Sequence, residues 1–404
     1  MHVILSTIGT DGDVFPHIGL GVALRARGHR VTLAAPEPFR SRAISFGLEF
    51  QPLATAEEYE RLLADPNFWH PFKSGFVTAR WGAPLIPRQY EAIARLAAQP
   101  HSVLVANSGV LAARLVQEKL RTRTATLLLQ PGLVQSSVEP PKLPGGLTIP
   151  KWLPLPLRGL GWVGLDAVGY ALLAPALNRV RSSLGLPPVR RVFRWWLSPE
   201  LVIGLFPPWY AAPQSDWPPQ LRLAGFGRFD GSPAALPEDV RAYCEYGPPP
   251  IAFTLGTGMK HATEFFRAAI AACDDLGLRG LLLTKYADMI PSALPPRLRH
   301  CSFVPFRQLL PRCAAVVHHG GIGTTAAALE AGCPQIILPL ALDQPDNASR
   351  VAKLGVGYAL GPHRRTGKGL SAALVKVMTP DIGQRCREIA QRAALEDGLE
   401  LAAQ

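Results

Sequence analysis

A chain of 404 residues exceeds the usual size of one domain, so two domains are expected. Hydrophobic residues make up 48% and charged residues 18%, and the 40 Pro and 37 Gly stay below the level of low-complexity sequence, which excludes a disordered chain, a collagen and a coiled coil. The net charge is +12, and the residues up to Phe206 hold 22 Lys and Arg against 13 Asp and Glu, which favours an anionic partner for that half. Because no zinc-finger or RNP-type motif is present, nucleic acid is not an expected partner.

The first half of the chain has the alternation of a parallel α/β domain. His2–Thr7 is a short apolar strand, the glycines and aspartates after it form a turn, and a helix is expected over Pro16–Arg27 before the next strand, Arg30–Ala35. Further strands of this half are expected at Val103–Ala106, Thr126–Leu129 and, as the last one, Leu201–Phe206. This order is typical of a doubly wound sheet.

A second α/β domain follows a proline-rich linker. Residues 207–220 contain five prolines and show no periodicity, which suits a connection between domains. Beyond it, strands are expected at Ile251–Leu255, Leu281–Thr284, Ala314–His318 and Gln335–Leu340, with a helix over Glu264–Leu276. The predicted organisation is a first domain over 1–206, a linker over 207–220 and a second domain over 221–404.

The cysteines and the apolar segments indicate a cytoplasmic protein. The six cysteines all lie in the second half and form no C-x-x-C pair, so neither a zinc site nor a disulfide framework is expected. The N-terminus lacks the pattern of a secretory signal. The longest apolar stretch, Leu160–Leu177, contains Asp166, and a charge at the centre of a bilayer costs about 2.5–3.5 kcal/mol, so no membrane-spanning helix is expected.

Residues 315–330 form the most informative segment, an apolar strand that runs through glycines into an alanine-rich helix. Backbone N–H groups at such a turn and the positive end of a helix dipole bind anions, and threonine hydroxyls and a histidine beside the turn add donors. The segment therefore predicts a phosphate site, with a tight strand–helix junction that holds no ligand as the alternative. The candidate phosphate-binding residues are His318, His319, Gly321, Gly323, Thr324 and Thr325.

The same glycines also satisfy a dinucleotide-binding fingerprint. Gly321-x-Gly323-x-x-Ala326 is followed by Asp343 twenty residues after Gly323, which is the spacing of a dehydrogenase. Two features oppose that interpretation. The turn follows three other strands of its domain, and Gln344 beside Asp343 makes a fork suited to sugar hydroxyls. A solvated turn before a helix is the simpler alternative for this pair.

A third candidate lies at the end of the first strand. Asp13 is expected at the carboxyl rim of the sheet, where a carboxylate can act as a general base. Asp11 could take that role instead, and either residue could serve only as an N-terminal cap for the helix near Pro16.

Together these motifs resemble the family 1 glycosyltransferases, which implies the GT-B fold of two Rossmann-like doubly wound domains facing each other across a cleft. His319-x-Gly321, Pro334, Pro339 and Asp343-Gln344-x-x-Asn347 are similar to the donor-binding signature of that family. Gly12-Asp13-x-x-Pro16 resembles its base motif, with aspartate as in the bacterial antibiotic-tailoring branch. Asp65–Trp69 and Leu205–Trp209 resemble the rhamnosyltransferases of rhamnolipid synthesis, where histidine stands only at the position of His318, so which histidine contacts phosphate stays open.

The resemblance implies an inverting, metal-independent hexosyltransferase that uses a UDP- or dTDP-sugar and no further cofactor. Asp13 would be the base, and Thr257 would reach the diphosphate from the opposite side. Phe303 would stack on uracil or thymine, while the backbone of Val304 would pair with the edge of the base. Asp343 and Gln344 would hold the sugar, rhamnose or glucose.

The acceptor is expected to be apolar. Arg190–Trp196 mixes basic and aromatic residues, which indicates either a helix with packed tryptophans or a lipid-facing, fatty-acyl-binding wall. With the basic charge of this half, a hydroxyalkanoic lipid acceptor and peripheral contact with an anionic membrane at its inner face are further expectations. The tryptophans considered for such a wall are Trp152, Trp162, Trp195, Trp196 and Trp209.

Three other functions stay open on the sequence. They are a nucleotide-sugar 2-epimerase of the same fold, an NAD-dependent dehydrogenase that uses the glycine turn, and an inactive protein that only binds a sugar nucleotide.

Overall fold

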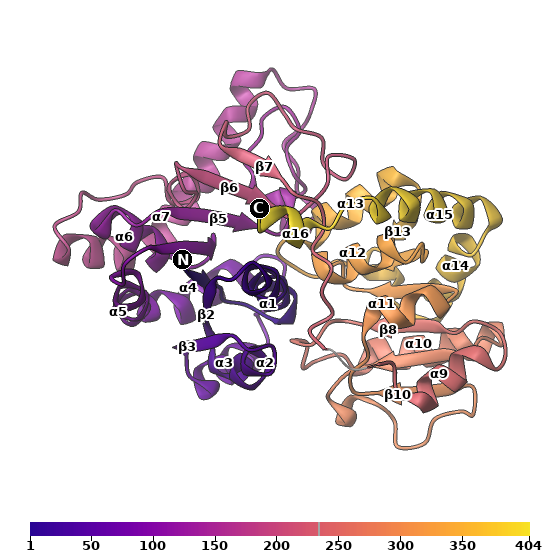
Figure 1. Cartoon of the computed structure of the whole chain (residues 1–404). Helices are drawn as coiled ribbons and strands as arrows, with labels where there is room; N and C mark the ends of the chain where they lie inside the picture. Colours follow the sequence, from indigo (N-terminus) through magenta and orange to yellow (C-terminus); the bar gives the residue numbers. More distant parts are fainter. Residues whose placement is uncertain (233–234) are drawn as a thin grey trace. The chain divides into compact units, whose positions relative to one another are not determined.

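The computed structural model describes residues 1–232 and 235–404 and divides them into two compact units. Unit 1 comprises Met1–Phe229 together with Asp397–Gln404, and unit 2 comprises Asp230–Glu396. Each unit contains one parallel β-sheet with helices packed against it (Figure 1). The predicted α/β class is therefore confirmed for both halves of the chain.

Unit 1 is built on a seven-stranded parallel sheet in the order β3-β2-β1-β4-β5-β6-β7. All five residues of β1 are buried, as expected for a central strand covered on both faces. The strands are β1 (His2–Ser6), β2 (Arg30–Pro36), β3 (Glu49–Ala54), β4 (Ser102–Asn107), β5 (Thr124–Leu128), β6 (Leu201–Gly204) and β7 (Leu221–Leu223). The helices are α1 (Asp11–Ala26), α2 (Arg40–Ser45), α3 (Ala56–Ala64), α4 (Ser74–Gly82), α5 (Ile86–Ala97), α6 (Leu111–Leu120), α7 (Leu155–Ser183), α8 (Val192–Trp195) and α16 (Gly398–Ala402).

Unit 2 has a six-stranded parallel sheet in the order β10-β9-β8-β11-β12-β13. Strands β8, β9 and β11 are fully buried and form the centre of its core. The strands are β8 (Ile251–Thr254), β9 (Gly280–Leu283), β10 (Leu298–Cys301), β11 (Ala315–His318), β12 (Gln335–Ile337) and β13 (Gly357–Ala359). The helices are α9 (Glu238–Glu245), α10 (Thr263–Leu276), α11 (Phe306–Leu309), α12 (Ile322–Glu330), α13 (Gln344–Leu354), α14 (Gly367–Val377) and α15 (Pro380–Ala394).

The strands that the sequence analysis did not predict are the edge strands of the two sheets. Strands β3 and β7 flank the sheet of unit 1, and β10 and β13 flank the sheet of unit 2. Each contains partly or fully exposed residues, so none carries the continuous apolar run that marks an interior parallel strand.

The boundary between the units also differs from the predicted one. Because Leu221 pairs with Val202 of β6, the sheet of unit 1 extends past the predicted linker at 207–220 and into the predicted second domain. The end of the chain returns to unit 1 as well. Gly398 N–H donates to the carbonyl of Phe226 at 3.0 Å, and Leu399 packs on Gly19 of α1. Residues 207–229 and 397–404 therefore belong with the first unit.

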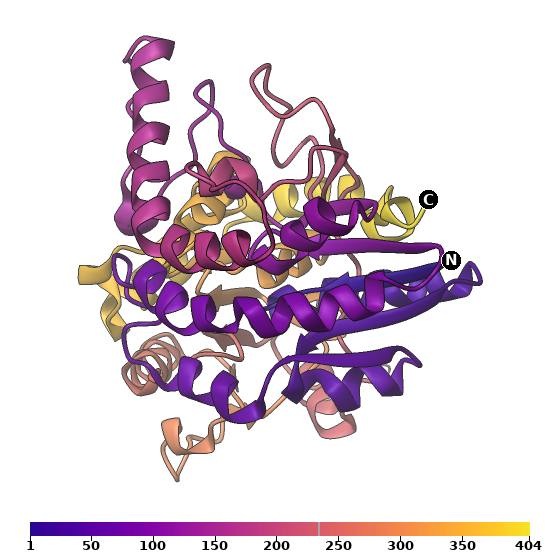
Figure 2. The same ribbon diagram turned by 90° about the vertical axis from the view of Figure 1, so that its left-hand side faces the viewer.

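Helix α7 is the longest helix of unit 1 and extends away from its sheet (Figure 2). Within the described residues it has the length and apolar composition that a membrane span needs, although only 22% of its most apolar window is buried. The sequence alone predicts no membrane-spanning helix here, because Asp166 interrupts the apolar stretch. That side chain lies on the buried face of α7, with 6% of its surface exposed.

Candidate functional site

A glycine turn in unit 2 joins strand β11 to helix α12. Gly320 has a φ of 94°, and Gly321 is the N-cap residue of this nine-residue helix. A Cβ atom on Gly320 would lie 2.6 Å from Ile337, so the turn needs glycine for its backbone angle and for space. The turn presents the first N–H groups of α12 at the carboxyl edge of the sheet, an arrangement that binds anions.

The two threonines of this turn differ in what their hydroxyls can do. Thr325 is fully buried, and its hydroxyl donates to the Gly321 carbonyl at 3.0 Å. The structure therefore assigns that hydroxyl to helix α12 instead of to a diphosphate, in contrast to the prediction. Thr324 retains a small exposed fraction of 8% and stays a candidate donor with Gly323.

The hydrogen bonds of the two adjacent histidines show that they have different roles. His318 is fully buried; its Nδ1 accepts from the N–H of Gly320 at 3.2 Å, and its Nε2 lies 3.0 Å from Oε1 of Gln335. Burial lowers the pKa of His318 to about 3. Because both ring nitrogens are occupied, His318 supports the turn from inside the protein, and His319 is the candidate for contact with phosphate.

His319 lies between two glycines of neighbouring loops. A Cβ atom on Gly256, in the loop after β8, would lie 2.8 Å from His319 Cε1, and one on Gly321 would lie 2.5 Å from its Nε2. These glycines make room for the ring and bring the loop that carries Thr257 beside the glycine turn. Burial lowers the pKa of His319 to about 4, so at neutral pH the imidazole carries no positive charge and can donate a hydrogen bond through one ring N–H.

Asp343 and Gln344 follow strand β12, at the start of α13. Burial raises the pKa of Asp343 to about 6, and its Oδ2 accepts from Asn347 at 2.7 Å. Oε1 of Gln344 accepts from the N–H groups of Leu340 and Ala341 at 2.7 and 3.1 Å. Since its oxygen holds the preceding loop in place, Gln344 supports Asp343 instead of forming an equal prong of a sugar-binding fork.

Asn347 belongs to the motif that resembles the donor-binding signature, but the sequence alone assigns it no specific role. Its side chain is fully buried, and its Nδ2 donates to the carbonyl of Gly320 at 2.9 Å as well as to Asp343. Asn347 thereby links the glycine turn to the acid on the neighbouring loop. The spacing of one helical turn between Asp343 and Asn347 is the signal that could have indicated this role.

Phe303 and Val304 follow strand β10 at the same edge of the sheet. Phe303 is 38% exposed, so its ring is accessible to a planar ligand. Val304 is 5% exposed and packs in the core cluster that contains Leu309 and Leu310. The buried valine therefore anchors a loop that displays an aromatic ring.

In unit 1, Asp13 lies in the first turn of α1, which begins at Asp11 instead of Pro16. The N-cap residue of this helix is Thr10 and not one of the two aspartates; Asp13, at the third helical position, accepts through Oδ2 from the N–H of Thr10 at 2.9 Å, as in a capping box. Gly9, with a φ of 121°, closes around this carboxylate, because a Cβ atom there would lie 2.1 Å from Oδ2. The hydrogen bond with Thr10 fixes the orientation of the carboxylate at the start of α1.

The basic and aromatic segment 190–196 is packed into unit 1. Trp195 lies over the guanidinium groups of Arg114 and Arg181, and its indole N–H donates to Glu118. Trp196 stacks edge-on against Phe193. These tryptophans do not form the lipid-facing wall that the sequence allowed.

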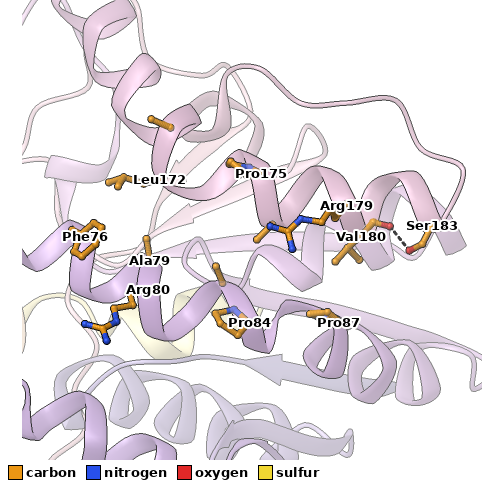
Figure 3. A pocket seen from close by; sticks show the side chains of 13 residues that line it. Phe76, Ala79, Arg80, Pro84, Pro87, Leu172, Pro175, Arg179, Val180 and Ser183 are labelled. Atoms are coloured by element: carbon orange, nitrogen blue, oxygen red, sulfur yellow. Dashed lines mark hydrogen bonds between the residues drawn. The ribbon is translucent and has the colours of Figure 1, made fainter.

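A groove of about 800 Å³ lies between α4 and α7 in unit 1 (Figure 3). Its walls are mostly alanine, proline and aliphatic side chains, with Arg80 from α4 and Arg179 from α7 among them. It therefore offers an apolar surface next to two positive charges. The lining residues are Phe76, Ala79, Arg80, Ala83, Pro84, Pro87, Ala171, Leu172, Pro175, Ala176, Arg179, Val180 and Ser183.

Three buried histidines predict that the protein loses stability in acid. Burial lowers the pKa of His17 and His319 to about 4 and that of His318 to about 3. The unfolded chain therefore binds more protons than the folded chain below the ordinary histidine pKa of about 6.5, and stability falls by up to about 1.4 kcal/mol per pH unit for each histidine. Asp343, with its raised pKa of about 6, stabilises the folded protein as the pH falls below that value. This gain offsets the loss of stability from one of the three histidines.

Urea unfolding at constant ionic strength between pH 7.5 and pH 5 measures this dependence. The free energy of unfolding should fall as the pH is lowered through this range. A constant or rising free energy would contradict the neutral state assigned to these histidines.

Comparison with known proteins identifies the family. The N-terminal domain of glycosyltransferase family 28 matches residues 3–126, and the C-terminal domain of the erythromycin biosynthesis protein CIII-like family matches residues 283–397. Glycosyltransferase GtfE of Amycolatopsis orientalis is 32% identical over 426 residues, which cover 100% of this chain and 96% of the relative. The chain belongs to the family of glycosyltransferases that contains GtfE. The vancomycin aglycone glucosyltransferase of the same organism is 31% identical to it and covers 96% of this chain, with 93% of the relative matched.

This glycosyltransferase also has the GT-B fold of solved relatives. The spinosyn rhamnosyltransferase SpnG complexed with thymidine diphosphate matches with a TM-score of 0.71 and 21% identity, over 100% of this chain and 99% of that chain. The spinosyn forosaminyltransferase SpnP matches with a TM-score of 0.73 and 20% identity, over 99% and 96% of the two chains. The glycine turn at 320–323 is therefore part of a glycosyltransferase and not of a dehydrogenase.

Proposed function

We propose that this glycosyltransferase moves a hexose, rhamnose or glucose, from a UDP- or dTDP-sugar to a hydroxyl group of a hydrophobic acceptor, with inversion at the anomeric carbon. The observation that supports it best is the placement of His319 between Gly256 and Gly321 at the start of α12. An uncharged N–H donor beside a helix N-terminus suits a diphosphate leaving group.

The proposed donor site uses the carboxyl edge of the unit 2 sheet. The diphosphate accepts hydrogen bonds from His319, from the first turn of α12 and from Thr257. The ring of Phe303 stacks on the nucleobase. Asp343, ionised at pH 7 because its pKa is about 6, accepts a hydrogen bond from a sugar hydroxyl. SpnG is complexed with thymidine diphosphate, and the vancomycin relative is named for the transfer of glucose. Both facts are compatible with a UDP-sugar or a dTDP-sugar as the donor.

The proposed reaction is a single displacement. Asp13 accepts the proton of the acceptor hydroxyl while that oxygen forms a bond to the anomeric carbon. The bond from this carbon to the phosphate oxygen breaks on the opposite face, and the nucleoside diphosphate leaves with the electron pair. One carboxylate is sufficient for this scheme, which needs neither a metal ion nor a further cofactor.

The proposed acceptor is an apolar or fatty-acid-derived molecule. The groove between α4 and α7 supports this class, because its walls are apolar and two guanidinium groups, from Arg80 and Arg179, can pair with a carboxylate. Its volume of about 800 Å³ is in the range of small-molecule sites. This proposal places the enzyme in the cytoplasm, where nucleotide sugars are made.

A transfer assay tests the function. The protein is incubated with UDP- and dTDP-activated rhamnose and glucose, with a 3-hydroxyalkanoic acid as acceptor, and the anomeric configuration of the product is measured by proton NMR. The expected result is a glycoside of inverted configuration from one donor class. A product of retained configuration would contradict the displacement, and conversion of the sugar nucleotide without acceptor would indicate an epimerase.

A further inference from the structure

Helix α7 is apolar on two opposite faces. One face is buried in unit 1 through Trp162, Gly169, Ala174 and Leu177, which follow a helical spacing. A surface helix of a soluble protein normally shows polar residues on its other face. On α7 that face is apolar and uncovered within unit 1. The aliphatic side chains on this opposite face are Leu157, Leu160 and Val168, with 48–62% of their surface exposed, and Leu155 and Val163, at 52% and 49%, are also exposed but lie nearer to the side of Trp162.

The two charged side chains in the first part of this helix, Arg158 and Asp166, are directed toward the protein. The guanidinium group of Arg158 donates to the backbone carbonyls of Leu153 and Ser137 at 2.7 and 3.1 Å. Asp166 is buried on the protein side. Because no other charged residue occurs between Arg158 and Arg179, the exposed face carries no charge over several helical turns.

The sequence around this apolar face is strongly basic. Residues 140–196 contain eight Lys or Arg residues and one acidic residue, Asp166. Arg190 and Arg191 are exposed, and Phe193, close to them in sequence, packs on Gly169 in the middle of α7. Trp152, just before the helix, is 81% exposed, and tryptophan is the residue that favours the boundary between lipid headgroups and acyl chains.

We propose that the exposed face of α7 docks on an anionic phospholipid membrane, with the helix lying in the plane of the membrane surface. Apolar side chains that enter the headgroup region, flanked by Lys and Arg, are the features that bind an interfacial helix to anionic lipid. The helix does not span the membrane, because its other face is packed on unit 1 and would have to leave those contacts. The docking is independent of the proposed transfer reaction.

The positive charge around the exposed face of α7 favours lipid over a second copy of the chain as the partner that covers this face. A symmetric dimer through α7 would bring the same patch of both copies together, and with it the basic residues of 140–196. Like charges at close range oppose that contact, whereas anionic headgroups neutralise them.

Vesicle flotation of the full-length protein tests this proposal. The vesicles contain phosphatidylcholine alone or phosphatidylcholine with phosphatidylglycerol. The wild-type protein should float with the anionic vesicles, and less so at high salt. The double variant Leu157→Glu and Leu160→Glu should bind at least about tenfold more weakly, since both acids face the lipid. Val375→Glu on α14 is the matched control, because Val375 is also an exposed aliphatic residue of a helix, at 59% exposure, and should bind like the wild type.

Three results would overturn the membrane proposal. They are no flotation of the wild-type protein with anionic vesicles, equal flotation of the double variant, and a concentration-dependent dimer in sedimentation that the double variant abolishes. Thermal unfolding checks that the variants fold. The transfer assay with a water-soluble acceptor should give the same rate for the double variant, so loss of membrane binding is distinguished from failure of the proposed function.

Discussion

Replacing Asp13 by Asn is expected to lower kcat by about 10²–10⁴-fold, the range that a positioned general base contributes. The amide oxygen of Asn can still accept from the N–H of Thr10, so the cap of α1 is kept while the basic oxygen is lost. The fold and the affinity for the donor should therefore change little. Initial rates at saturating donor and acceptor measure the effect.

Two further variants separate the base from the cap. Asp11→Asn removes a negative charge from the same first turn of α1 and should retain kcat to within about threefold if Asp13 is the base, as proposed. Asp13→Ala removes both functions and should lose activity together with about 1 kcal/mol of stability. Activity of Asp13→Asn within a few fold of the wild type, or a loss of equal size in Asp11→Asn, would assign the base to another residue.

Replacing His319 by Ala is expected to lower kcat/KM by about 10²–10³-fold, the effect of removing one preorganised donor from a developing negative charge. The pKa of about 4 adds a sharper expectation. The ring is neutral over the whole range from pH 5.5 to pH 8. The affinity of the wild-type protein for the donor should therefore show no change near pH 6.5 that is caused by His319 and lost in His319→Ala. Donor affinity measured across this range checks the point.

His318 provides the control on the same turn. His318→Asn disturbs the bonds to Gly320 and Gln335, so it should cost about 1–3 kcal/mol of stability. The fraction that remains folded should keep kcat/KM to within about threefold. If His318→Asn loses as much kcat/KM as His319→Ala at equal folded fraction, the assignment of the two histidines is wrong.

The interior of both sheets could be predicted from the sequence because their strands are continuous apolar runs, such as β1 and β11. The edge strands could not, since partial exposure leaves them polar residues. The return of the C-terminus to unit 1 rests on the contact of Leu399 with Gly19, which are far apart in the chain and have no local signal.

The glycine turn and its anion-binding character follow from residue types alone, because glycines between an apolar strand and a helix leave backbone N–H groups open to a ligand. The division of roles does not follow from residue types. His318 and His319 are adjacent, and only the hydrogen bonds of the ring nitrogens show which one is used inside the protein. The same holds for Gln344, whose oxygen is taken by the backbone of its own loop.

Titration calorimetry with dTDP and UDP tests the donor site most directly, because it needs neither the acceptor nor the sugar. The wild-type protein should bind at least one of the two nucleotides. Asp13→Asn should bind it with unchanged affinity, and His319→Ala should bind it at least about tenfold more weakly, a loss of about 1.4 kcal/mol. Absence of binding to the wild-type protein, or unchanged affinity in His319→Ala, would show that the glycine turn at 320–323 does not hold the diphosphate.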